Sequence, residues 1–226
     1  MPRYMSFRFD DGFFHGALKA NAMLDPDRGS FFIVTGLVDK THRPDHIPLF
    51  VGRKFGTIAD WRVLARAGHD IQPHSVTHAN LPLLTREQWV EEVERSLAFV
   101  KKIHAGPYVF CHPYNALTDL DFASLGFAAA GFSGRGLQDA IPYNDLSTLN
   151  PYLLRSSVLP EDQYDWLVEN LSTHVPDNGW VILGFHSFDG EGLRPWSSGG
   201  FSRLVAEVRR LGFQIRTIAS MVGSRD

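Results

Sequence analysis

The chain has 226 residues, of which 44% are hydrophobic, and its formal net charge is −3. This length suits one α/β domain with a sizeable core, which we expect to span residues 1–226. A slightly acidic chain without a basic run is not expected to bind nucleic acid, and its single cysteine excludes an intrachain disulfide.

The N-terminal residues contain no apolar segment of the kind that signal peptides carry. No window approaches the ~18 apolar residues of a membrane span. We therefore expect a cytoplasmic protein without a membrane partner.

Short apolar runs alternate with amphipathic segments along the chain. The pattern predicts strands at 4–9, 30–35, 108–111, 127–132, 152–158, 180–185 and 213–218. It predicts helices at 15–24, 57–67, 85–104, 119–125, 161–174 and 199–211, with loops at 41–48 and 137–151. This alternation favours one parallel sheet, either open or closed into a barrel.

Functional groups of such folds gather at the carboxyl ends of the strands, and the unusual residues of this chain fall there. Asp10 and Asp11 follow the first predicted strand, Tyr114 follows the strand at 108–111, and His186 follows the strand at 180–185. Because Gly12 permits a turn after the two carboxylates, both can reach one cavity. One could bind a cation while the other stays free to transfer protons.

The segment H-S-V-T-H places His74 and His78 four residues apart. On a helical turn this spacing directs both imidazoles to one side. Together with Asp11 they form a two-histidine, one-carboxylate set that suits a divalent transition metal. The alternative is that one histidine is a surface or N-cap residue.

Two further motifs are weaker signals. The pair Pro113-Tyr114 forms a stiff turn that could aim a backbone N–H into a cavity, although a simple turn explains it equally well. His186 ends an apolar strand, with Asp189 and Glu191 near enough to orient it. A histidine beside apolar residues is otherwise a core residue.

Together these motifs resemble the polysaccharide deacetylase family, also called carbohydrate esterase family 4 or the NodB-homology fold. The resemblance implies an irregular (β/α)7 barrel that hydrolyses an N-acetyl group of an amino sugar. It further implies Asp10 as catalytic base, His186 as general acid and the Tyr114 N–H as oxyanion donor. The implied ligands of one divalent ion are Asp11, His74 and His78. Zinc is the first expectation, and cobalt, nickel, manganese and iron suit the same site.

The chain departs from the family pattern at two motifs. Cys111 stands where the family carries an arginine that orients the catalytic aspartate, and a D-x-x-D-W motif is absent. Arg155 is a candidate to orient Asp10 instead, or is an ordinary strand-end arginine. Asp70 either supports the histidine ligands or pairs with an arginine, and Trp196 is expected to line the pocket with Pro113. His112 is either a pocket or a loop residue.

These features predict a metal-dependent deacetylase acting on an N-acetylated amino sugar or oligosaccharide. One alternative is hydrolysis of another non-peptide C–N bond, in a cyclic amide, a ureide or an N-formyl group. The other is a relative that binds glycans without turnover.

Overall fold

The structure, a computed structural model, describes residues 1–39, 47–133 and 140–223. The predicted loops at 41–48 and 137–151 lie partly outside this range. The helices are α1 (Phe14–Leu24), α2 (Ile58–Arg66), α3 (Arg86–Val100), α4 (Tyr164–Thr173), α5 (Ser198–Arg210) and α6 (Ile218–Gly223). The strands are β1 (Arg3–Phe9), β2 (Ser30–Ile33), β3 (Asp70–Pro73), β4 (Val109–Phe110), β5 (Ala129–Ala130), β6 (Phe132–Ser133), β7 (Asn144–Asp145), β8 (Leu154–Arg155), β9 (Gly179–Phe185) and β10 (Phe213–Ile215).

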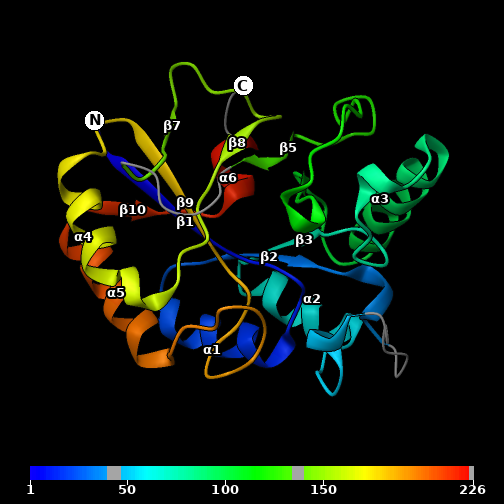
Figure 1. Cartoon of the computed structure of the whole chain (residues 1–226), viewed down its shortest axis with the longest axis horizontal. Helices are drawn as coiled ribbons and strands as arrows, with labels where there is room; N and C mark the ends of the chain where they lie inside the picture. The colour runs from blue at the N-terminus through cyan, green and yellow to red at the C-terminus, as the bar shows by residue number, and fades with distance from the viewer. Residues whose placement is uncertain (40–46, 134–139, 224–226) are drawn as a thin grey trace.

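A curved, mainly parallel sheet forms the centre of the molecule, with α1, α2, α4 and α5 outside it (Figure 1). The strand order is β3-β2-β1-β9-β7, and β10 pairs with the first half of β1. Only β7 runs antiparallel to its neighbour. The parallel arrangement predicted from the sequence is confirmed.

Backbone hydrogen bonds extend this sheet through the short strands and close it into a ring. Cys111 N donates to Pro73 O at 3.4 Å and joins β4 to β3, and Gly131 N donates to Phe110 O at 3.1 Å. Leu154 N donates to Gly131 O at 3.0 Å, and Gly184 N donates to Ser157 O at 2.8 Å, which returns the ring to β9. The irregular α/β barrel expected from the sequence is therefore confirmed.

The side chains of β1 alternate between two apolar layers, as the period of a strand requires. Met5, Phe7 and Phe9 point outward into the main core, where they meet α1, α2, α4 and α5. Tyr4 packs on a second cluster inside the barrel, which includes Phe132 of β6. The inner face of β1 is thus the face that leads to the pocket at its carboxyl end.

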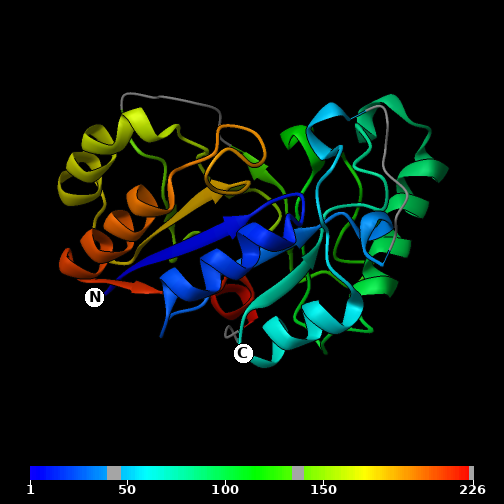
Figure 2. The same ribbon diagram turned by 90° about the horizontal axis from the view of Figure 1, so that it is seen from below.

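The opposite end of the barrel is covered by α6, which lies near the middle of the view from below (Figure 2). Ala219 N donates to Asp70 Oδ2 at 2.7 Å, and Ile218 N donates to Ser30 Oγ at 2.9 Å. Asp70 also accepts from Ser30 Oγ at 2.9 Å. Both expectations for Asp70 are therefore wrong: it begins β3, far from His74 at the other end, and it anchors α6 rather than pairing with an arginine.

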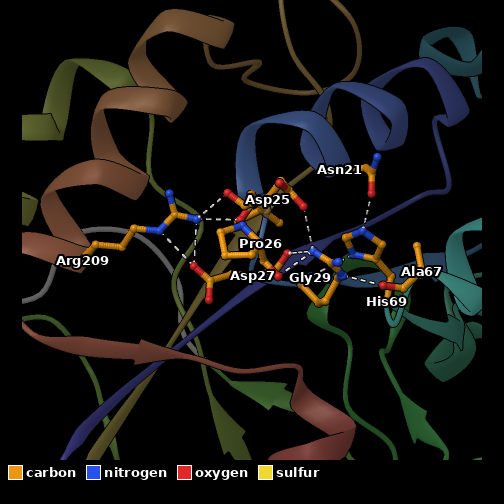
Figure 3. Close-up of polar contacts among 10 residues, drawn as sticks. Asn21, Asp25, Pro26, Asp27, Gly29, Ala67, His69 and Arg209 are labelled. Carbon is orange, nitrogen blue, oxygen red and sulfur yellow. Dashed lines mark hydrogen bonds and ion pairs between the residues drawn. The ribbon is translucent and has the colours of Figure 1, made fainter.

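A second polar cluster joins α1, α5 and the start of β2 (Figure 3). His69 Nδ1 accepts from Gly29 N at 3.0 Å, and its Nε2 lies 2.8 Å from Asn21 Oδ1. Arg209 of α5 forms an ion pair with Asp27 at 2.8 Å. The cluster therefore fixes the neutral Nε2–H form of His69 and ties the 25–29 turn to two helices.

The two neighbours His69 and Asp70 have pKa values shifted in opposite directions. Burial, with the positive charge of Arg28, lowers the pKa of His69 to about 4. Burial raises the pKa of Asp70 to about 6, although hydrogen bonds from Ala219 and Ser30 oppose the shift. Burial thus shifts the protonation equilibrium of each group toward its neutral form.

The structure contains the long helices and strands that the sequence predicted, but several short elements differ from the prediction. The segment 119–125 forms turns rather than a helix, and the segment predicted as a strand at 127–132 is broken at Gly131, whose φ is +76°. The last strand ends at Ile215, because α6 begins at Ile218. None of the helices in the described ranges combines the length and apolar character needed to cross a bilayer.

Candidate metal centre and active site

A pocket of about 670 Å³ opens at the carboxyl ends of β1, β3, β4 and β9. The acidic, imidazole and tyrosine side chains named by the sequence motifs line it: Asp10, Asp11, His74, His78, Tyr114 and His186. Segments separated by more than a hundred residues therefore meet at one place, as the strand-end argument predicted.

The turn after β1 brings both carboxylates to this pocket. Asp10 N still donates to Phe185 O of β9 at 2.8 Å, so Asp10 is held as a continuation of the strand. Asp11 and Gly12 both have left-handed backbones, with φ of 72° and 81°. A Cβ at position 12 would lie 3.1 Å from Ile33, so the close approach of β2 also requires glycine there.

The segment 74–78 is a loop and not the helical turn predicted from its spacing. Ser75 and His78 have positive φ values of 62° and 59°, and Ser75 Oγ accepts from His78 N at 3.0 Å. The two imidazoles still converge, with ring centroids 5.1 Å apart. The two imidazoles therefore face one place as predicted, but a loop and not a helical turn brings them together.

Glu92 of α3 holds this loop from outside. Its Oε2 accepts from Val76 N and Thr77 N, each at 2.9 Å, and its Oε1 accepts from Thr77 Oγ1 at 2.9 Å. Its carboxylate thereby satisfies donors that a loop without regular structure would otherwise leave to water. The sequence offered no signal for this role, because an acidic residue on a helix surface is common.

Asp11, His74 and His78 form a buried cluster whose ligand atoms all lie within 4.8 Å of one another. Asp11 Oδ1 lies 3.1 Å from His78 Nε2 and 3.5 Å from His74 Nε2. His74 Nδ1 lies 2.8 Å from the carbonyl oxygen of Cys111, which directs the other ring nitrogen to the cluster. Two imidazole nitrogens and one carboxylate beside an open pocket fit a divalent transition metal.

The electrostatics of the cluster suit a cation. Burial alone would raise the pKa of Asp11, but hydrogen bonds from His74 and His78 hold that pKa well below its usual range. Burial lowers the pKa of His78. Burial opposes protonation of His74 too, yet Cys111 and Asp11 raise its pKa well above the ordinary value. The cluster therefore holds an ionised carboxylate whose charge a bound cation can neutralise.

Asp10 pairs with Arg8, which the sequence analysis overlooked. Arg8 Nη2 lies 3.2 Å from Asp10 Oδ2, and both side chains are buried. The expectation that Arg155 orients Asp10 is wrong: its side chain is exposed and lines a separate surface hollow with Asp145 and Leu153. Alternation along β1 puts Arg8 and Asp10 on one face, which was the available signal.

His186, at the carboxyl end of β9, also lines the pocket. Its Nδ1 is buried and has no hydrogen-bond partner within the described part of the chain. Asp189 instead binds Lys19 and Ser198, and Glu191 accepts from Ser187 Oγ, so the expected orientation of His186 by these acids is wrong.

The segment after β4 closes the pocket. Pro113 begins a short 3-10 turn (Pro113–Asn115), in which Tyr114 has a φ of 60°. The Tyr114 ring lies against that of His78, with centroids 4.6 Å apart. His112 lines the pocket as well, with burial lowering its pKa to about 4.

Trp196 belongs to the core and not to the pocket. It is 2% exposed, packs edge-on against Phe185, and donates from Nε1 to Leu159 O at 2.7 Å. The expectation that it lines the substrate site is therefore wrong. The large apolar area of a tryptophan side chain favours its burial in the core even when its backbone belongs to a loop.

Comparisons with known proteins agree with this fold. Residues 3–127 match the family model described as polysaccharide deacetylase. No curated protein is significantly similar to the chain.

Several solved structures share the fold. One is a carbohydrate esterase family 4 domain of a multidomain xylanase from the hindgut metagenome of Trinervitermes trinervoides (13% identity, 99% of this chain and 91% of that chain, TM-score 0.63). Another is a family 4 carbohydrate esterase from Streptomyces lividans in complex with acetate (18%, 97% and 95%, 0.58). A third is a family 4 pseudoenzyme from Bacillus anthracis (10%, 98% and 66%, 0.60).

Proposed function

The chain belongs to the polysaccharide deacetylase family, and from this premise we propose that it is a metal-dependent hydrolase that removes the acetyl group from an N-acetylated amino sugar or oligosaccharide. The observation that carries the proposal is the convergence of Asp11, His74 and His78 in one pocket that Asp10 and His186 also line. We propose zinc as the first candidate for the ion.

The assigned roles follow from the chemistry of amide hydrolysis. Asp11, His74 and His78 would hold the divalent cation, whose charge polarises the amide carbonyl and favours deprotonation of an attacking water. Asp10 accepts the proton of that water. The Tyr114 N–H donates to the carbonyl oxygen as negative charge develops on it.

His186 donates a proton to the departing nitrogen in this scheme. An amine is a poor leaving group without such a proton, and an imidazole is suited to supply it near neutral pH. Apolar side chains on the pocket wall, among them Ile47, Phe50 and Val158, suit the methyl group of an acetyl substituent.

The test is a release assay with metal-stripped and zinc-loaded protein on N-acetylglucosamine oligomers, with N-formyl and cyclic amide compounds beside them. We expect acetate only, and only from the loaded protein. Formate or ammonia instead of acetate would move the assignment to another C–N bond. Oligosaccharide binding without any product under every divalent cation would make the protein a non-catalytic relative. Undiminished acetate release by the stripped protein would refute metal dependence.

A further inference from the structure

Arg8 is a charged residue near the carboxyl end of the central strand, β1. It is 1% exposed and lies between Phe7 and Phe9, whose rings point to the opposite face. A guanidinium at such a position is costly to bury unless its charge is paired and its donors are used. Its surroundings should therefore reveal what it does.

The guanidinium is held on several sides. Besides Asp10 Oδ2, its nitrogens lie 3.2 Å from Cys111 Sγ and 3.4 Å from Asn115 Oδ1. Its Cζ lies 4.6 Å from the centroid of the Phe132 ring. The planar group is thus fixed between an aromatic face and the pocket wall, with one nitrogen directed at the Asp10 carboxylate.

Gly184 of β9 makes room for this group. A Cβ at position 184 would lie 2.6 Å from Arg8 Nε and 3.1 Å from Arg8 Nη2. The neighbouring strand therefore has to lack a side chain at the level where the guanidinium crosses it. The position of the Arg8 guanidinium therefore depends on glycine at position 184.

Position 111 faces the same carboxylate from the other side. Cys111 Sγ lies 3.9 Å from Asp10 Oδ1 and 3.2 Å from Arg8 Nη1. Because the family pattern has arginine at position 111, a guanidinium from there would occupy the space that the Arg8 guanidinium now fills. The chain carries the small thiol at 111 and the arginine at 8.

We propose that Arg8 is the positioning residue of Asp10 and that it takes over, from the opposite wall, the task of the arginine that Cys111 replaces. The inference rests on the proposed function, since it assumes that Asp10 is the base. Arg8 holds the Asp10 carboxylate away from the cation site. Asp10 is accordingly outside the cluster formed by Asp11, His74 and His78 among the described residues.

Without Arg8, two adjacent carboxylates would face one divalent cation. Carboxylate oxygens are ordinary ligands of such ions, so Asp10 would be drawn to the metal and lost as a base. The role therefore predicts a change in metal coordination as well as a loss of turnover. A merely structural role of Arg8 would not move the coordination.

The experiment compares Arg8→Ala, Arg8→Ala/Cys111→Arg and Arg155→Ala with the wild type. For acetate release from N-acetylglucosamine oligomers, we expect Arg8→Ala to lower kcat at least 100-fold with KM within threefold and one metal ion per chain retained. The double variant should recover at least tenfold over Arg8→Ala. Arg155→Ala, which removes an exposed arginine from another surface, should match the wild type.

A second readout does not need turnover. In cobalt-loaded protein, the visible absorption of Arg8→Ala should show an added ligand, and the double variant should return to the wild-type spectrum. This arm decides the inference even if the wild type releases no acetate, which would refute only the proposed function. Should Arg8→Ala not fold, Gly184→Ala, which keeps the arginine but intrudes on it, should show the same spectral change. A kcat within threefold of wild type, or an unchanged cobalt spectrum in folded variants, would overturn the inference.

Discussion

Removal of the Glu92 carboxylate tests how the loop that carries His74 and His78 is held. In Glu92→Ala, Val76 N, Thr77 N and Thr77 Oγ1 all lose their acceptor. Hydrogen bonds of a half-exposed carboxylate contribute about 1 kcal/mol each, so the three together stabilise the loop by about 3 kcal/mol. The loop should then sample conformations in which the two imidazoles no longer converge.

The expected result is a metal affinity reduced about 10–100-fold, which corresponds to about 1.4–2.7 kcal/mol. Competition with a chromogenic chelator at fixed pH measures this directly. The matched control is Glu91→Ala, one position earlier on α3. Glu91 is exposed and, among the residues that the structure describes, pairs only with Arg95, at 2.7 Å, so its loss should change neither the affinity nor the fold.

An affinity of Glu92→Ala within twofold of the wild type would refute the reasoning. The bond from His78 N to Ser75 Oγ and the backbone bonds to the Thr35–Leu37 turn would then suffice to shape the loop. Thermal unfolding of the metal-free variants checks that α3 stays intact.

Two further predictions concern parts of the molecule away from the metal. The folded pKa of His69, about 4, lies below its unfolded value near 6.5, so the stability that His69 contributes is lost as pH falls from 6.5 to 4. The folded pKa of Asp70, about 6, lies above its unfolded value of 3.8, so Asp70 adds stability as pH falls from 6 to 3.8. Asp70→Asn removes that gain, and urea unfolding should show it losing about 2 kcal/mol more than wild type between pH 6.5 and 4; parallel profiles would contradict this. Trp196→Phe leaves Leu159 O without its donor and should cost about 1–3 kcal/mol in unfolding free energy with kcat unchanged. A large fall in kcat would instead indicate that Trp196 contributes to the pocket.

The sequence predicted the barrel and most of the pocket because both follow from periodicity and strand ends. Short continuous apolar runs such as β2 and β9 are typical of strands covered on both faces. Carboxyl ends of parallel strands meet at one edge, so Asp10, Asp11 and His186 had to lie near one another. Local pattern was enough for these conclusions.

What the sequence could not supply depends on tertiary contacts. The strands β4, β5 and β8 are two residues long, and their extent is set by hydrogen bonds around the ring rather than by propensity. The turn at Ser75 and His78 requires positive φ values that neither residue type signals. Arg8 and Arg155 illustrate the same limit. Alternation along β1 puts Arg8 on the face of Asp10, but only the tertiary structure shows that its guanidinium is buried against Gly184 while Arg155 is exposed.

The most direct test is anomalous diffraction at the absorption edge of the bound metal in crystals of the zinc-loaded protein. The account predicts one peak about 2.0–2.2 Å from a carboxylate oxygen of Asp11 and from Nε2 of both His74 and His78, with Asp10 held by Arg8 and not bound to the ion. An active, metal-loaded protein whose peak lies elsewhere, or whose three side chains are free of the ion, would contradict it.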